Sequence, residues 1–394
     1  MSITRTTGGA VAVFRDRGRR RPRRPRRGRG WVAAATGLSI LLTACRFPGA
    51  VRPTVKVGLV APFEGRHRYV GYDVFYAVQL ALLEVNQEGG VGGLGVELVA
   101  YDDGADPEMA VEQAQKLAVD PDVVVALGHF REDTTVAAAG TYEETGLPLV
   151  AALALNYQVK RDGEPVYLAG PPTRRLAEAL LERALDLAPA GDIIVVADGG
   201  VLEQALLDVA EDGGVRPVTI TTDREGWVRD VLMGEPVVLV CLLDPVPAAE
   251  MLITLRREGW AGHVLGGPRL SAGDFLAVAG EVALGATFVT PWAFPADVDG
   301  GQQFAEAYRQ VSQGAEPGPW ALSAYVATWA LLEGLDHAAT DGLPSRQRVS
   351  AALSAAERSG TLDRWRVGEG PPASDWAVYW YQIGPDGVPV LLAE

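Results

Sequence analysis

Hydrophobic residues follow two different periods along most of this chain. Short apolar runs rich in β-branched residues alternate with longer segments in which apolar residues recur every three or four positions. The first pattern predicts buried strands and the second predicts amphipathic helices. In the first part of the chain we expect strands at 55–60, 96–101, 123–127 and 147–151, and helices at 72–87, 108–118 and 134–144. This order is typical of a parallel sheet covered by helices on both faces.

The same alternation starts again near residue 173, so we expect a second α/β unit. Its helices are predicted at 173–187, 202–212, 248–258 and 271–279, and its strands at 192–197, 215–219, 236–242, 263–265 and 284–289. Three further helices follow at 302–312, 319–336 and 345–356. The segment WAVYWYQI at 376–383 alternates in polarity and precedes Gly387, which predicts a terminal β-hairpin with 389–392.

The first 44 residues have a different composition from the rest. They hold 11 arginines and one acidic residue, Asp16, and end in the uncharged run WVAAATGLSILLTA. That run is shorter than the roughly 20 residues of a membrane span, and a basic region before a short apolar core is typical of a secretory signal. Leu42-Thr43-Ala44-Cys45 resembles the lipobox of bacterial lipoproteins. We therefore expect 1–44 to be a signal peptide, Cys45 to be acylated and 45–53 to be a lipid-anchored tether outside the cytoplasm.

Charge and cysteine content narrow the possible functions. Without residues 1–44 the formal charge falls from -15 to -25, and such an acidic body argues against nucleic-acid binding. Two cysteines are too few for a disulfide framework. The second, Cys241, lies in the apolar run VVLVCLL and is expected to be a small buried residue. No later segment is long and apolar enough to predict another membrane span.

Motifs that would indicate an enzyme are missing. The segment GVGGLG at 90–95 matches a dinucleotide-binding pattern, but it follows a predicted helix and precedes a strand, which is the reverse of the required order. It is therefore predicted to be a turn. The sequence has no Walker A, HExxH or GxSxG motif, and its four histidines are not at metal-ligand spacing. Asp102-Asp103 leads into a turn in which Asp106 should cap the next helix. We predict no catalytic residue, no metal and no cofactor.

The segment at 55–97 reads VKVGLVAPFEGRHRYVGYDVFYAVQLALLEVNQEGGVGGLGVE and includes Gly65, Gly71, Ala81 and Asn86. At these positions it shows a resemblance to the branched-chain amino acid (leucine/isoleucine/valine) family of type I periplasmic binding proteins. It continues in DDGADPEMAVEQAQKL, in Leu127-Gly128-His129, in AVAGEVALGATFVTPW and in PWALSAYVATWALLEGL. It covers about residues 54–390 and is most specific in the first 100 of them.

The resemblance implies two Rossmann-like parallel-sheet lobes joined by a hinge of several crossovers. Residues 54–170 and 291–357 would form one lobe, and 171–290 and 358–394 the other. A small molecule would bind in the interlobe cleft, beyond the carboxyl ends of the strands, and would close the lobes about the hinge. Permease subunits of an ABC-type transporter would then recognise the closed protein, which would act as a monomer. On this interpretation the chain is an extracytoplasmic substrate-binding lipoprotein that captures an amino acid-like, amide or carboxylate solute.

The expected ligand loops depart from the family's pattern. The family's serine-rich run after "GH" aligns with Phe130-Arg131-Glu132-Asp133-Thr134-Thr135, where Asp133 or Thr134 should cap the following helix. The next loop has lost its hydroxyls, and the family's amine-binding acid aligns with Pro268 or Arg269. The α-amino-acid clamp is therefore predicted to be lost. The candidate ligand-binding residues are Arg66, Tyr69, Phe130, Arg131, Thr134, Leu155, Asn156, Asp244 and Arg269.

The candidate residues leave several functions open. Clustered arginines suit an anionic or bidentate oxygen ligand, whereas rim arginines would simply pair with Glu64, Glu132 or Asp133. Two other roles compete with transport on the same scaffold. One is a ligand-sensing receptor that signals closure to a partner, and the other is a degenerate domain that binds no small molecule.

Overall fold

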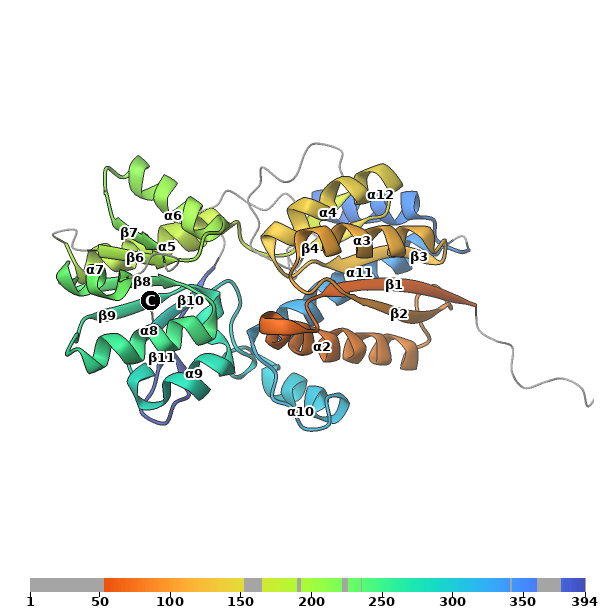
Figure 1. Ribbon diagram of the computed structural model, residues 1–394. Helices are drawn as coiled ribbons and strands as arrows, with labels where there is room; N and C mark the ends of the chain where they lie inside the picture. The colour runs from red at the N-terminus through yellow and green to blue at the C-terminus, as the bar shows by residue number, and fades with distance from the viewer. Residues whose placement is uncertain are drawn as a thin grey trace, which may run out of the picture. The chain divides into compact units, whose positions relative to one another are not determined.

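Two separate β-sheets organise the chain in the computed structural model (Figure 1). The structure describes residues 53–151, 165–189, 193–221, 226–234, 236–340, 342–359 and 377–393. Arg52–Glu394 belong to one compact unit. The predicted signal peptide and Cys45 lie outside the described residues. Among the helices that the structure describes, none has both the length and the apolar character needed to cross a bilayer.

The first sheet has five parallel strands, and the continuous apolar runs predict four of them. Its order is β2-β1-β3-β4-β5, and every neighbouring pair is parallel. The strands are β1 (Thr54–Ala61), β2 (Gly95–Asp102), β3 (Val123–Gly128), β4 (Leu149–Ala151) and β5 (Val166–Leu168). We did not predict β5.

Helices cover both faces of this sheet, and we call the sheet with these helices lobe 1. One face packs against α2 (Arg68–Gln87), α11 (Pro319–Ala338) and α12 (Arg346–Ser359). The other packs against α3 (Pro107–Val119) and α4 (Glu132–Thr145). The late helix α10 (Gly301–Val311) also packs on α2. Lobe 1 is thus completed by helices that lie more than 120 residues beyond its last strand.

The second sheet has seven strands in the order β12-β11-β10-β9-β8-β6-β7. Its strands are β6 (Ile193–Ala197), β7 (Val218–Thr221), β8 (Val238–Leu242), β9 (His263–Gly266), β10 (Thr287–Thr290), β11 (Tyr379–Ile383) and β12 (Pro389–Leu391). The pairs from β6 to β10 are parallel. β11 and β12 are antiparallel and extend the sheet at one edge, which confirms the predicted terminal hairpin.

Helices also cover both faces of the second sheet, and we call this unit lobe 2. One face packs against α5 (Thr173–Leu187) and α6 (Val201–Asp212). The other packs against α7 (Trp227–Met233), α8 (Pro245–Arg257) and α9 (Gly273–Ala279). Cys241 is fully buried in β8, as predicted, and burial raises the pKa of its thiol to about 12. We did not predict α7.

Two turns confirm local predictions made from glycine and aspartate. Gly90 has a positive φ of 76°, and a Cβ there would lie 1.7 Å from the carbonyl oxygen of Leu94. The glycine-rich segment is therefore a tight turn between α2 and β2, and no helix begins there. Asp106 caps α3 by accepting hydrogen bonds from the backbone N–H groups of Glu108 and Met109, both at 2.9 Å.

Candidate functional site

A cavity of about 160 Å³ lies among loops that follow the carboxyl ends of the parallel strands. Lobe 1 contributes the segments after β1 and β3, and lobe 2 contributes the last residue of β8 and the segments after β6, β9 and β10. Such an edge is where open α/β sheets bind ligands. The lining residues are His67, Tyr69, Val70, Phe130, Arg131, Glu132, Asp133, Thr173, Leu176, Gly199, Gly200, Val201, Leu202, Glu203, Leu242, Gly267, Pro268, Arg269, Pro291 and Trp320.

Most of the cavity wall is apolar or aromatic. Tyr69, Phe130 and Trp320 come from lobe 1, whereas Leu202 and Leu242 come from lobe 2. Phe130 is almost fully buried. Burial raises the pKa of the Tyr69 hydroxyl, so this side chain is neutral. A wall of this kind with a few polar groups is typical of small-molecule sites.

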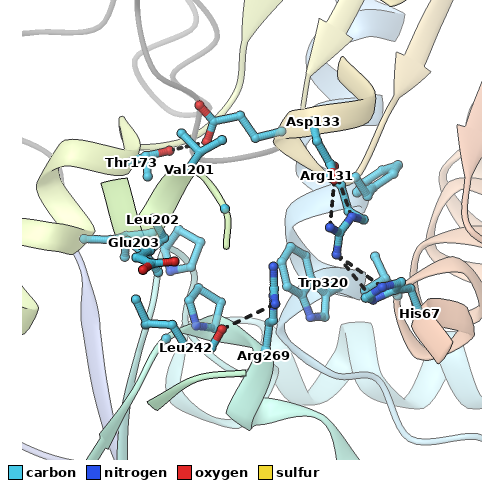
Figure 2. A pocket seen from close by; sticks show the side chains of 18 of the residues that line it. His67, Arg131, Asp133, Thr173, Val201, Leu202, Glu203, Leu242, Arg269 and Trp320 are labelled. Atoms are coloured by element: carbon cyan, nitrogen blue, oxygen red, sulfur yellow. Dashed lines mark hydrogen bonds and ion pairs between the residues drawn. The ribbon is translucent and has the colours of Figure 1, made fainter. Parts of the chain in front are cut away.

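Polar groups line the two sides of the cavity (Figure 2). In that view Arg131 and His67 lie on one side, Leu202 and Glu203 lie on the other, and Arg269 lies between them. Helices α4 and α6 both begin at this cavity, with Arg131 and Gly200 at their N-cap positions. The free N–H groups at helix starts are hydrogen-bond donors that a ligand oxygen can use.

The start of α4 differs from the prediction. The N-cap residue is Arg131, which is extended and makes no side-chain cap, so neither Asp133 nor Thr134 caps the helix. Thr134 is fully buried and its hydroxyl donates to the Arg131 carbonyl at 3.0 Å. Asp133 instead accepts from the Thr134 backbone N–H and from Arg131. The helix begins earlier than expected because the threonine hydroxyls bond backward to carbonyl groups and do not accept from the first turn.

Arg131 is held by the carboxylate two residues along the chain. Its Nε and Nη2 atoms donate to the two Asp133 oxygens at 3.1 and 2.8 Å. Its Nη1 lies 3.3 Å from His67 Nε2. Burial disfavours the guanidinium charge, but the hydrogen bonds to Asp133 raise the pKa of Arg131 overall. Burial alone would likewise raise the pKa of Asp133, yet Arg131 lowers it, so both groups are charged.

Arg269 is held by carboxylates from two other strands. Its Nη1 lies 3.1 Å from Asp198 Oδ1, after β6, and 3.2 Å from Asp244 Oδ1, after β8. The same nitrogen lies 3.4 Å from the Leu242 carbonyl oxygen. Because β9, β8 and β6 are neighbours in the sheet, the loops that follow them meet at one point.

Asp244 connects the lobe 2 group to lobe 1. Its Oδ2 lies 3.7 Å from His67 Nε2 and 3.9 Å from Arg66 Nη1. Burial lowers the pKa of His67, the charge of Arg131 lowers it further, and Asp244 opposes this only in part. His67 is therefore neutral near pH 7. Arg66 and Asp244 do not line the main cavity but border a second one, of about 220 Å³, together with Arg68 and Asp274.

The structure thus brings together some of the predicted ligand residues and separates others. Tyr69, Phe130, Arg131 and Arg269 line the main cavity. Arg66 and Asp244 lie on the second cavity, and Thr134 lies behind the loop. Leu155 and Asn156 lie outside the described residues. The expected pairing of rim arginines holds for Arg131 with Asp133, whereas Arg66 approaches Asp244.

Several parts of the cavity were not predicted from the sequence, among them the segment after β6 and the start of α11. Gly199-Gly200 and Glu203 follow β6, and the glycine pair between a strand and a helix was the available signal. Trp320 comes from the start of α11, and nothing in its local sequence connects it with β1 or β3. It is positioned by Asp73 of α2, whose carboxylate accepts from the backbone N–H groups of Gly318 and Ala321 at 2.8 and 2.9 Å.

A buried polar network supports the loop after β3. His129 Nδ1 lies 2.8 Å from Asp103 Oδ2, and Nε2 lies 3.0 Å from the Tyr142 hydroxyl. All three side chains are inaccessible to solvent. The network joins the carboxyl ends of β2 and β3 to α4, so it fixes the backbone that precedes Phe130 and Arg131. Within the described residues no cluster of three or more histidine, cysteine or acidic side chains could hold a metal ion.

Comparison with known proteins gives consistent matches. Residues 54–375 match the sequence model of a family described as periplasmic binding proteins. A Leu/Ile/Val-binding protein homolog of Brucella abortus is 30% identical over 123 residues, 31% of this chain, and the match spans only 33% of that relative. A leucine-, isoleucine-, valine-, threonine- and alanine-binding protein of Pseudomonas aeruginosa is 25% identical over 324 residues, 77% of this chain and 82% of that protein.

Solved structures share the same fold. A leucine-binding protein of Thermotoga maritima superposes with a TM-score of 0.71 at 19% identity, over 86% of this chain and 98% of that one. This similarity confirms the predicted α/β architecture with two parallel-sheet lobes.

Proposed function

Because the chain belongs to the periplasmic binding protein family, in the type I group related to leucine/isoleucine/valine-binding proteins, we propose that it is the substrate-binding component of an ABC-type transporter. It captures a small polar solute outside the cytoplasm and presents it to permease subunits as a monomer. The single observation that carries this proposal is the cavity lined by strand-end loops of both lobes. A solute held there contacts both lobes and can therefore shift the equilibrium between their arrangements.

The size and lining of the cavity support a compact solute with an apolar body. About 160 Å³ is enclosed by aromatic and aliphatic side chains. Two guanidinium groups and the starts of α4 and α6 offer hydrogen-bond donors to an oxygen of the ligand. An amino acid-like compound, an amide or a carboxylate has such an oxygen. The family resemblance implies that Pro268 or Arg269 takes the place of the acid that binds the ligand amine, so we propose that a free α-amine is not required.

The N-terminal sequence supports attachment to a membrane. Arginines, a short apolar core and Leu42-Thr43-Ala44-Cys45 together favour cleavage before Cys45 and acylation of its thiol. More than one acyl chain gives stable anchoring where a single chain is marginal. Intact-mass measurement of the membrane-extracted protein tests this directly. A mass lacking residues 1–44 with added acyl chains is expected, and an unmodified Cys45 at the mature N-terminus would overturn the lipoprotein assignment.

A thermal-shift screen of residues 46–394 tests the transport role. The panel contains amino acids, amides, short-chain carboxylates, ureas and aromatic acids. A ligand at 100 times its Kd adds about 2.7 kcal/mol to the stability of the folded protein, so a true solute gives a clear shift. A shift with α-amino acids alone would show that the chain keeps an α-amino-acid clamp and that its predicted loss is wrong. If no member of a broad panel shifts the melting temperature, the result favours a degenerate or partner-binding domain over a solute-binding one.

A further inference from the structure

We propose that Asp244 is the internal counter-ion of the cleft and that it selects against solutes with a net negative charge. The proposal rests on the binding role proposed above and specifies the solute further, as one whose polar group is uncharged, such as an amide. Asp244 does not line the main cavity. It acts through Arg269 and His67, which do, and it is therefore a positioning residue for their charges.

A continuous network of charged and polar side chains connects the two lobes. It begins in lobe 1 with Asp133 and Arg131, which are joined at 2.8 Å, and Arg131 reaches His67 at 3.3 Å. His67 lies 3.7 Å from Asp244, and Asp244 lies 3.2 Å from Arg269. Arg269 then lies 3.1 Å from Asp198. Both guanidinium groups in this network of side chains therefore already face a carboxylate of the protein.

The charges in this network of side chains do not favour the binding of an added anion. Two guanidinium groups face three carboxylates, and His67 between them is neutral because of its burial and the nearby Arg131. Arg66 also approaches Asp244, at 3.9 Å, but its side chain is 79% exposed and water screens its charge. Glu132 and Glu203 add two more acidic side chains to the lining. A ligand carboxylate would meet like charges in a partly buried site, where repulsion is stronger than in water.

The conformation of Asp244 shows that its carboxylate is not used to stabilise its own helix. Asp244 occupies the N-cap position of α8, where aspartate normally accepts hydrogen bonds from the first turn, but it makes no such bond. It is 5% exposed, and its Oδ1 accepts no hydrogen bond from the described residues although Arg269 Nη1 is 3.2 Å away. A buried carboxylate oxygen without a hydrogen bond calls for a specific role. Here that role is to neutralise Arg269.

An anion titration tests the counter-ion role without knowledge of the solute. The melting temperature of the purified protein is measured in sodium formate and in sodium chloride at equal ionic strength. The wild type should respond identically to the two salts. Asp244→Asn should gain a saturable stabilisation by formate, with an apparent Kd at least about tenfold lower than any seen in the wild type, because one of the repelling charges is gone.

Three further variants separate charge from structure. Asp244→Glu keeps the charge and should behave as the wild type. Asp274→Asn removes an acid that borders only the second cavity and should also behave as the wild type. If Asp244→Asn does not fold, Asp198→Asn removes the other carboxylate on Arg269 and should gain the same response to formate. Equal formate stabilisation in wild type and both asparagine variants, or none in any of them, overturns the proposal.

The solute screen distinguishes this proposal from the transport role. For any compound that binds, its carboxylate and amide forms are compared on the wild type, for example isovalerate with isovaleramide or benzoate with benzamide. Tighter binding of the amide is expected. Tighter binding of the carboxylate overturns the counter-ion role and leaves transport intact. A panel without any ligand, combined with the expected formate response, overturns transport and leaves the counter-ion role in place.

Discussion

The two arginines of the cleft are held in opposite ways. Arg131 of lobe 1, the N-cap residue of α4, pairs with Asp133 in the first turn of that helix, and the Asp133 side chain is 41% exposed. Arg269 of lobe 2 pairs with Asp198 and Asp244, which lie 71 and 25 residues away and reach it only because β6, β8 and β9 are adjacent. The Arg131–Asp133 pair requires only the local backbone at the start of α4. The second requires the whole sheet, so it links the charge of the cleft to the integrity of the fold.

The largest expected effect is a contrast between the same substitution in the two lobes. Arg269→Ala leaves Asp244 buried without its partner, and breaking such a pair costs roughly 3–5 kcal/mol. We expect the loss of stability in Arg269→Ala to lie at the lower end of this range, because the side chains of Arg269 and Asp198 are 27% and 31% exposed. Arg131→Ala leaves Asp133 free to turn toward water, and we expect about 1 kcal/mol or less. Urea unfolding of both variants measures the difference, and equal losses would contradict it.

The two aspartate caps repeat this contrast on a smaller scale. Asp106 caps its own helix, whereas Asp73 of α2 caps α11, more than 240 residues away in sequence. Loss of a cap costs about 0.5–2 kcal/mol. Asp73→Ala should lie at the upper end, because it also releases the turn that carries Trp320 into the cavity. Asp106→Ala should lie at the lower end and leave solute binding unchanged. Thermal unfolding together with a binding titration checks both, and unchanged binding in Asp73→Ala would contradict the link to Trp320.

The smallest expected effect concerns His67, which joins the two arginine groups. Its pKa is lowered in the folded protein, by burial first and then by Arg131, with smaller contributions from Arg269 and Arg66 and opposition from Asp244. The stability it contributes is present above pH 6.5, the ordinary histidine value, and is lost as the pH falls through the folded pKa. His67→Gln should therefore lose less stability than the wild type on acidification below pH 6.5. The exposed His263, changed to Gln, serves as the control and should follow the wild type.

Sequence alone predicted most of the architecture, because continuous apolar runs and helical periods are local signals. The central strand β1, the terminal hairpin and the Asp106 cap all depend on residues close together in sequence, and all three are confirmed. Strand β5 and helix α7 were missed, whereas β4 and α9, which have the same numbers of residues, were predicted.

The site was predicted less completely because its contacts are formed by strand order. Phe130 and Arg131 were found because they align with the loop that follows "GH" in the family that the sequence resembles, and both line the cavity. Trp320 reaches the cavity only because α11 packs on α2, and no local sequence pattern predicts its position there. Asp244 was predicted to bind the ligand, yet its carboxylate lies against Arg269 and His67. Arg269 pairs with Asp198 and Asp244 because β6, β8 and β9 are adjacent in the sheet.

The most direct test of the central claim is isothermal titration of the best compound from the solute screen against a variant with a filled cavity. Val201→Trp places a large side chain in the lining of the main cavity, and Val278→Trp places one beside the second cavity, where Val278 is already 41% exposed. If the solute binds between the lobes, Val201→Trp abolishes binding while its melting temperature stays near that of the wild type, and Val278→Trp binds normally. Undiminished binding by a folded Val201→Trp protein would contradict the account.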